Sequence, residues 1–151
     1  MNPYLTVFLL AMTPVGELRA SLPLALLIYK MPVEVAFLIS YIGNIIPPIL
    51  IIFLLDPISK FLSERSIFAK RFFEWLFRRT RSRSSIIERY EMIGLIIFIA
   101  IPFPLTGAWT GSIAAFLLGI KPKRSIISVL IGVFIAGIIV TLSTLGVLSL
   151  F

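Results

Sequence analysis

The chain has 151 residues, of which 59% are hydrophobic and 14% are charged, and its mean hydropathy is +1.07. Soluble globular domains are roughly 45–50% apolar and about 25% charged, so the composition excludes an ordinary soluble domain. We expect an all-α integral membrane protein, a single membrane domain over residues 1–151 that lies in the cell membrane.

Cysteine and histidine are both absent. Their absence removes disulfides, thiolate and imidazole metal ligands, and the usual enzymatic nucleophiles and bases. We therefore expect no enzyme activity, no catalytic residue, no metal and no cofactor. The net charge is +7, but in so apolar a chain the positive-inside rule explains it better than nucleic-acid binding.

Four apolar blocks are each long enough to cross a bilayer core about 30 Å thick. They cover Tyr4–Tyr29, Val33–Leu55, Met92–Ile120 and Ser125–Phe151. The intervening stretch 56–91 holds nine of the 14 basic residues. We divide the chain into a first repeat (1–55), a basic linker (56–91) and a second repeat (92–151).

The first and third blocks contain helix-breaking prolines. Pro14 and Pro23 interrupt the first block, and Pro102 and Pro104 interrupt the third. Proline removes a backbone donor and disfavours helical geometry in the residue before it. Because lipid cannot satisfy the exposed backbone, such a break has to be buried in protein or line a wet cavity. We predict two re-entrant helical hairpins here, and full transmembrane helices in the second and fourth blocks.

An internal repeat supports this division. An offset of 90 residues places Pro14 on Pro104 and Pro32 on Pro122. Paired halves that each carry a Gly/Pro-interrupted segment are typical of secondary transporters.

The distribution of charge predicts the topology. With two re-entrant hairpins, the linker and the cluster Lys121–Arg124 face one side, which then carries twelve basic residues, against Lys30 alone on the other side. The positive-inside rule places 56–91 in the cytoplasm and both termini outside. The two halves would then form an inverted repeat in a multi-pass protein.

The linker has a helical period of apolar residues. Phe68, Phe72 and Trp75 recur at spacings of three and four, which predicts an amphipathic helix in the membrane interface. An alternative is a solvated helix packed on the transmembrane core. In the interfacial arrangement the basic side chains that contact lipid headgroups are Arg71, Arg78 and Arg79.

Glu17 and Arg19 are the two ionisable residues within the apolar blocks that point most strongly to function. An ionisable side chain at membrane depth costs at least about 2.5–3.5 kcal/mol to insert and is a functional candidate by default. At two residues apart they point in different directions on a helix, so each needs another partner. The alternative is that Thr13 caps a short helix and Glu17 only complements a helix dipole.

The third block supplies a second polar group at its break. Gly107 allows close helix approach, while Thr106 and Thr110 can satisfy freed backbone groups or donate to a ligand. Trp109 is either a cavity wall or an interfacial belt residue. Asn44 in the second block either hydrogen-bonds across helices or faces the cavity. We predict a substrate site formed by Glu17, Arg19, Asn44, Thr106, Gly107, Trp109 and Thr110.

The segments PVGELRASLPLAL and IPFPLTGAWTGSIAAFLLG resemble the small multidrug export family, which is itself similar in plan to the DedA superfamily of membrane proteins. The resemblance implies two opposed re-entrant hairpins that meet near the membrane centre and, from the DedA relatives, translocation of lipids. DedA proteins carry an arginine in the second hairpin, whereas this chain has Trp109 and Thr110 there and Arg19 in the first.

The sequence as a whole favours a small translocase that works as a homo-oligomer, with a dimer favoured, among membrane lipids as partners. Its substrate would be an amphiphilic anion such as a lipid phosphate. Glu17 would be the protonatable group and Arg19 the anion contact. The alternatives are a small-molecule (multidrug) exporter and a non-transporting scaffold that binds lipid through its basic linker.

Overall fold

The computed structural model describes residues 2–81, 85–102 and 106–149, and these residues form helices and turns without any strand. The elements are α1 (Pro3–Met12), α2 (Glu17–Pro23), the π-helical segment η1 (Leu24–Ile28), α3 (Val33–Arg65), α4 (Ile67–Arg81), α5 (Ser85–Ala100), α6 (Ala108–Leu117) and α7 (Pro122–Leu148). The prediction of an all-helical protein is therefore confirmed for the described part of the chain.

Helices α3 and α7 are long and apolar enough to cross a membrane. The 33 residues of α3 correspond to about 50 Å at about 1.5 Å per residue, well beyond a hydrocarbon core of about 30 Å. Helices α1 and α6 are also apolar but have ten residues each, about half the length that a full crossing needs. By length and composition, the long helices agree with the two predicted transmembrane helices.

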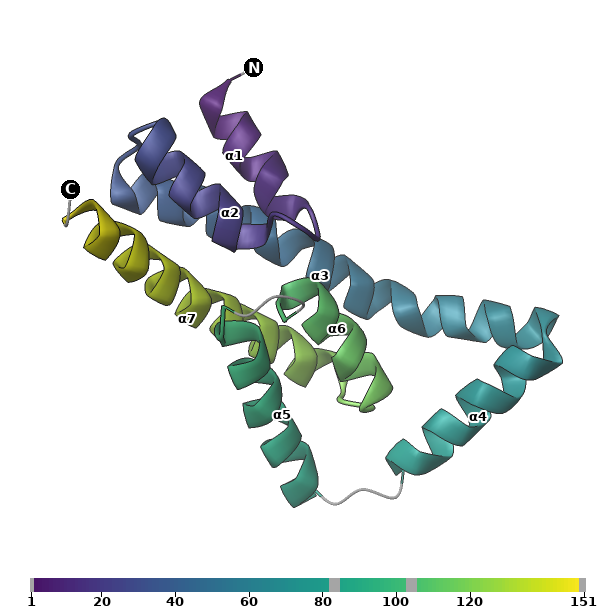
Figure 1. Ribbon diagram of the computed structural model, residues 1–151. Helices are drawn as coiled ribbons and strands as arrows, with labels where there is room; N and C mark the ends of the chain where they lie inside the picture. The colour runs from purple at the N-terminus through teal and green to yellow at the C-terminus, as the bar shows by residue number, and fades with distance from the viewer. Residues whose placement is uncertain (1, 82–84, 103–105, 150–151) are drawn as a thin grey trace.

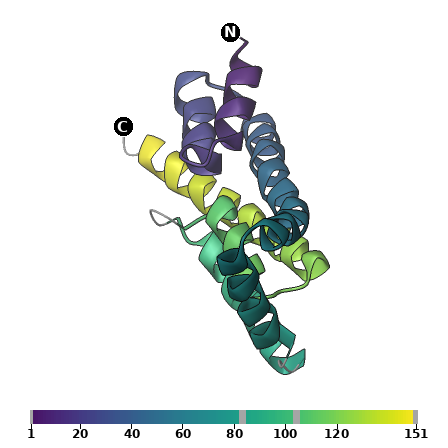
Figure 2. The same ribbon diagram turned by 90° about the vertical axis from the view of Figure 1, so that its right-hand side faces the viewer.

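Each of the two proline-broken blocks forms a pair of adjacent helices. Helix α1 lies against α2, and α5 lies against α6. Figures 1 and 2 show both chain ends at one end of the molecule, and the end of α4 and the start of α5 at the other. Helix α1 begins at the end of the molecule with the termini, whereas α5 begins at the opposite end (Figure 1). The start of α2 meets the start of α6, where the Trp109 amide donates a hydrogen bond to the Glu17 carboxylate.

The same order of elements occurs twice along the chain: a helix, a break, a short helix, a turn and a long helix. The two turns are also alike. Lys30 and Gly119 adopt left-handed φ angles of 48° and 69°, and each is followed by a proline at the start of the long helix, Pro32 before α3 and Pro122 in α7. Proline suits a helix start because its missing N–H would have no partner there.

Pro23 does not interrupt the helical structure, contrary to the prediction. Helix α2 ends at this residue, but the chain continues directly into η1. The amide of Tyr29 donates to the carbonyl of Leu24 at 3.1 Å, five residues back. The missing proline N–H is thus accommodated by a wider helical turn instead of an interruption.

Pro14 and Pro102 do lie in breaks, the first between α1 and α2 and the second between α5 and α6. Pro104 lies outside the described residues.

The basic linker is not one helix. Helix α3 continues through Pro47, Pro48 and Pro57 to Arg65, so the predicted boundary at residue 56 falls inside a helix. The backbone turns extended at Ser66, with φ −137° and ψ 124°, and α4 begins at the next residue.

Helix α4 has apolar residues on more than one side. Leu76 is 4% exposed, and the ring of Phe73 packs edge-on against Phe116 of α6 at 6.2 Å between centroids. Phe68, Phe72 and Trp75 remain exposed, Phe68 to 84%. The helix therefore contacts α3 and α6 through one side, while the predicted aromatic stripe stays exposed.

The core joins both halves of the chain. Buried Leu18 and Leu22 of α2 belong to one cluster with Ile99 of α5 and Val133 of α7. Glycine permits the closest helix contact, because a Cβ atom on Gly43 of α3 would lie 2.7 Å from the Phe8 carbonyl oxygen and 2.9 Å from Ala11 Cβ. Small residues at such crossings are how membrane helices gain van der Waals contact.

Replacing Gly43 by alanine should separate α1 from α3. We expect Gly43→Ala to lower the free energy of unfolding by about 1–3 kcal/mol, the usual cost of overpacking. Gly94→Ala is the matched control, because nothing lies within 4 Å of a Cβ built there, and alanine in a helix is favoured over glycine by about 0.5–1 kcal/mol. Thermal unfolding in detergent compares the two; equal shifts would contradict the close α1–α3 contact.

Candidate functional site

The break between α1 and α2 is stabilised by its own side chain. The Thr13 hydroxyl donates to the Leu10 carbonyl at 2.8 Å and accepts from the Gly16 amide at 3.0 Å. The Glu17 amide donates to the Thr13 carbonyl at 3.0 Å. Thr13 therefore closes the turn after α1 and does not cap α2, whose N-cap residue is Gly16, contrary to one of the two interpretations of the sequence. The Glu17 side chain is left available for contacts elsewhere.

Glu17 reaches across to the second half of the chain. Its backbone has a φ of 45°, a left-handed conformation that a non-glycine residue adopts only where its surroundings hold it. The side chain is buried, at 7% exposure. Its Oε1 atom accepts a hydrogen bond from the Trp109 amide at 3.3 Å. The carboxylate of one half thus lies at the N-terminus of a helix in the other half.

Helix α6 depends on this contact because its N-cap residue has no side chain that could accept a hydrogen bond from the first amides of the helix. This residue is Gly107. Its φ of 153° and ψ of −172° lie in a region essentially restricted to glycine. A Cβ atom on Gly107 would collide with Glu17 Oε2 and lie 2.7 Å from Oε1. Glycine therefore provides both the backbone conformation and the space for the carboxylate.

Arg19 makes a second link between the halves. Its Nη2 atom donates to the Ile101 carbonyl at 3.0 Å and to Thr106 Oγ1 at 3.2 Å. The Thr106 hydroxyl donates in turn to the Ile101 carbonyl at 2.9 Å. Because α5 ends at Ala100, the Ile101 carbonyl has no place in a helical ladder. The guanidinium and the hydroxyl satisfy it instead.

We call the contacts of Glu17 and Arg19 with residues 101–109 the junction. Besides Gly107, four of the predicted site residues take part in it. Glu17, Arg19 and Thr106 are joined through it, and Trp109 contributes its amide. Thr110 is less involved, since its hydroxyl donates to the Gly107 carbonyl at 3.3 Å within its own helix. Ile101 is a participant that the sequence prediction missed. The signal was its position before Pro102, which ends the helix and releases its carbonyl.

Asn44 takes no part in these hydrogen bonds. It is 3% exposed on α3, and its Oδ1 atom has no hydrogen-bond partner among the described residues. Three further buried polar atoms also lack a hydrogen-bond partner among the described residues: the hydroxyls of Ser21 and Ser40 and the indole Nε1 of Trp109. Ser40 and Asn44 lie one turn apart, so they share a face of α3. Sequence reasoning did not single out the two serines.

The basic residues that were predicted to contact lipid headgroups lie on α4 and not at this junction. Arg71 and Arg78 are exposed on α4, and the Arg78 Nε atom donates to the Glu74 carbonyl at 3.4 Å. The side chain of Arg79 lies outside the part of the chain that the structure describes.

Comparison with known proteins identifies the family. The model of the family described as "Putative small multi-drug export protein" matches residues 17–139, which is most of the chain and includes the whole junction. No curated protein and no solved structure matches the chain. The chain therefore belongs to this export family. Membership of the family together with the two long apolar helices indicates a membrane protein.

A double-mutant cycle tests the junction. Gly107→Ala should destabilise the protein because the new methyl group collides with the Glu17 carboxylate and the backbone is strained. In a Glu17→Ala background the collision is absent and only the strain remains, so the same change should cost less. We expect a coupling energy of about 0.5–3 kcal/mol, as for residues in contact, measured by chemical unfolding in detergent. Additive effects would show that the two residues do not touch.

Proposed function

We propose that this member of the small multi-drug export family is a proton-coupled membrane transporter that moves an amphiphilic anion past the contact between its two hairpins. The observation that carries the proposal is the position of the Glu17 carboxylate at the N-terminus of α6, 3.3 Å from the Trp109 amide. A helix N-terminus favours negative charge through its unsatisfied amides and its dipole. The carboxylate therefore occupies a place suited to a substrate anion.

The membrane arrangement in this proposal has α3 and α7 as full crossings and the two helix pairs as re-entrant hairpins from opposite sides, in an inverted repeat. The opposite directions of the pairs in Figure 1 support it, as does the excess of basic residues in 56–91 and at Lys121–Arg124 under the positive-inside rule. Residues 56–91 would be cytoplasmic and both termini outside. We propose a homodimer as the working unit, surrounded by membrane lipids.

Protonation of Glu17 is the step that would exchange the internal anion for the external one. As an ionised group, Glu17 complements the positive end of α6 and holds the two hairpin turns together. Protonation removes its negative charge, so the attraction to the α6 amides weakens. The α6 N-terminus and the Arg19 guanidinium then favour a different anion at the same place. Loss of the proton on the other side of the membrane would restore Glu17 to α6 and displace the substrate.

Arg19 suits the headgroup of such a substrate. A guanidinium can bind a carboxylate or phosphate with two parallel hydrogen bonds. Two of its present acceptors, Thr106 Oγ1 and the Ile101 carbonyl, are neutral. An anionic acceptor forms stronger hydrogen bonds than a neutral one, so a substrate anion could replace them without loss.

Export of uncharged or cationic small molecules is the second candidate, because the description of the family names multi-drug export. It places no requirement on Arg19 as an anion contact. A non-transporting scaffold is the third candidate. It requires the linker but not Glu17.

Substitution at Glu17 and Arg19 separates these candidates. In reconstituted vesicles with an imposed pH gradient, Glu17→Gln should reduce uptake of a fluorescent alkyl phosphate at least about tenfold, since the glutamine cannot take up and release a proton. Arg19→Lys should weaken binding of that probe several-fold, because the planar fork is lost. Glu34→Gln, on the exposed first turn of α3, is the control with the same chemical change.

The probe identifies the substrate class. Transport of the alkyl phosphate but not of a cationic dye supports the anion proposal. Dye efflux that depends on Glu17 but not on Arg19 favours the drug-export candidate. Normal transport of the alkyl phosphate by both variants, with the fold intact, contradicts the assignment of the site.

Cysteine labelling tests the topology, since the chain has no native cysteine. Ser66→Cys and Lys123→Cys lie at exposed positions and should react with an impermeant maleimide from the same side of sealed vesicles. Ser149→Cys, also at an exposed position, should react from the opposite side. If all four apolar blocks crossed fully, Ser66→Cys would instead react together with Ser149→Cys, and the re-entrant arrangement would be wrong.

A further inference from the structure

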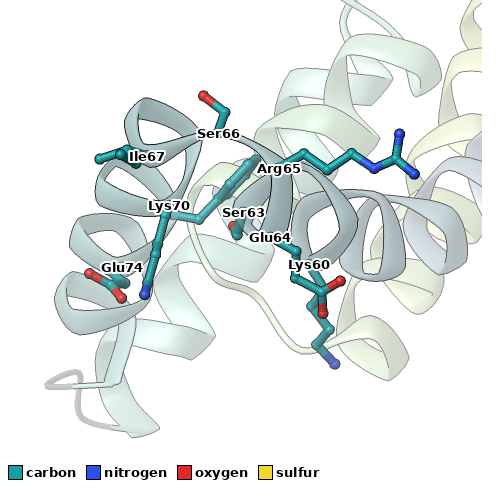
Figure 3. A pocket seen from close by; sticks show the side chains of 9 residues that line it. Lys60, Ser63, Glu64, Arg65, Ser66, Ile67, Lys70 and Glu74 are labelled. Atoms are coloured by element: carbon teal, nitrogen blue, oxygen red, sulfur yellow. The ribbon is translucent and has the colours of Figure 1, made fainter.

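A pocket of about 540 Å³ lies in the elbow where α3 ends and α4 begins. Its size is within the range of small-ligand sites, about 300–1,000 Å³. Figure 3 shows that its walls come from the last turns of α3 and the first turns of α4. It is lined by Lys60, Ser63, Glu64, Arg65, Ser66, Ile67, Lys70, Phe73 and Glu74. The lining therefore contains charges of both signs as well as apolar groups.

The arrangement of these charges is not that of a simple anion site. The Arg65 guanidinium lies 4.3 Å from the centre of the Phe61 ring, and in Figure 3 it points away from Lys70. Lys60 forms an ion pair with Asp56 at 3.0 Å. Lys70 is the remaining cation of the lining, and the carboxylates of Glu64 and Glu74 extend from the two walls (Figure 3). An added phosphate alone could pair with Lys70, but it would leave the carboxylates of Glu64 and Glu74 without a cationic partner.

The depth of the elbow in the membrane follows from the length of α3. Apart from Glu34 in its first turn, this helix carries no charge over 33–55, and the first charge after that stretch is Asp56. Those residues span about 35 Å at about 1.5 Å per residue, close to the thickness of the hydrocarbon core. Lys60 and Lys70 follow within a few turns, so the pocket lies at the level of the lipid headgroups when α3 crosses the membrane.

We propose that this elbow pocket binds the headgroup of a phospholipid that carries both a phosphate and a primary ammonium group, as phosphatidylethanolamine does. Lys70 contacts the phosphate, and the carboxylates of Glu64 and Glu74 accept hydrogen bonds from the ammonium. Charge-assisted hydrogen bonds of this kind are roughly twice as strong as neutral ones. Ile67 and Phe68, both largely exposed at 77% and 84%, offer an apolar surface to the acyl chains beside the pocket.

Two related headgroups should fit less well. Phosphatidylcholine has a quaternary ammonium without N–H donors, so it cannot hydrogen-bond to the carboxylates. Phosphatidylglycerol has no ammonium group and carries a net negative charge toward Glu64 and Glu74. The pocket therefore selects by the ammonium group, and the site is independent of the transport proposal.

The experiment measures lipid binding to the full-length protein in detergent by native mass spectrometry. Phosphatidylethanolamine, phosphatidylcholine and phosphatidylglycerol with identical acyl chains are added at equal concentrations. We expect phosphatidylethanolamine to bind at least about fivefold more tightly than the other two. The double variant Glu64→Gln with Glu74→Gln should lose this preference, whereas the control Glu34→Gln, outside the pocket, should retain it.

Lys70→Gln provides a complementary readout. It should weaken phosphatidylethanolamine and phosphatidylglycerol alike, because both present a phosphate, while Lys123→Gln on α7 should leave both unchanged. The thermal midpoint without lipid verifies the fold of each variant, and if the double variant is unfolded, Glu74→Gln alone decides. Equal binding of the three lipids by the native protein, or an undiminished preference in the folded glutamate variants, would overturn the proposal.

Discussion

A carboxylate in the first half of the chain caps a helix of the second half. Helix α6 begins at a glycine that has no capping side chain, and Glu17 of α2 supplies the missing acceptor at 3.3 Å from the Trp109 amide. Unsatisfied amides at a buried helix end are costly. The strained backbone of Glu17, the glycine at 107 and the break at Thr13–Gly16 all serve this contact.

The contact between Glu17 and α6 is compatible with both interpretations of Glu17, as a group that stabilises a helix end and as a protonatable group. A buried charge is expensive unless it is paired or hydrogen-bonded, and here the amide at the start of α6 and the neighbouring Arg19 compensate the Glu17 carboxylate. A contact that depends on one negative charge is also one that a single proton can weaken. The proposed transport mechanism uses this property, and it is compatible with membership of an export family.

Much of the architecture could be predicted from the sequence because it follows from local chemistry. The breaks at Pro14 and Pro102 and the long apolar helices were identified correctly from proline and hydropathy. Pro23 was not, because whether proline interrupts a helix or widens it to a π turn depends on packing around it. The chain also gave no local sign that α3 passes Pro57 or that α4 begins after Ser66.

For the site, the side chains that take part were identified from the sequence, but their backbone partners were not. Glu17, Arg19, Thr106 and Gly107 stood out as unusual residues in apolar blocks, and the structure places them at one junction. Their acceptors and donors included the Ile101 carbonyl and the Trp109 amide. Every residue has such backbone groups, so side-chain patterns alone cannot identify which of them take part.

The adjacent prolines Pro47 and Pro48 in α3 give this helix a mechanical property of its own. Neither residue has an N–H, so the carbonyls of Gly43 and Asn44 lose their partners four residues along the helix. Two consecutive rungs of the ladder are missing next to the crossing with α1, where Gly43 meets Phe8. The bending stiffness of α3 is therefore lowest at that level. A displacement of the α1–α2 pair would therefore tilt the part of α3 that follows Pro48. Conversely, a change in bilayer thickness that tilts this part of α3 would exert a force on the α1–α2 pair.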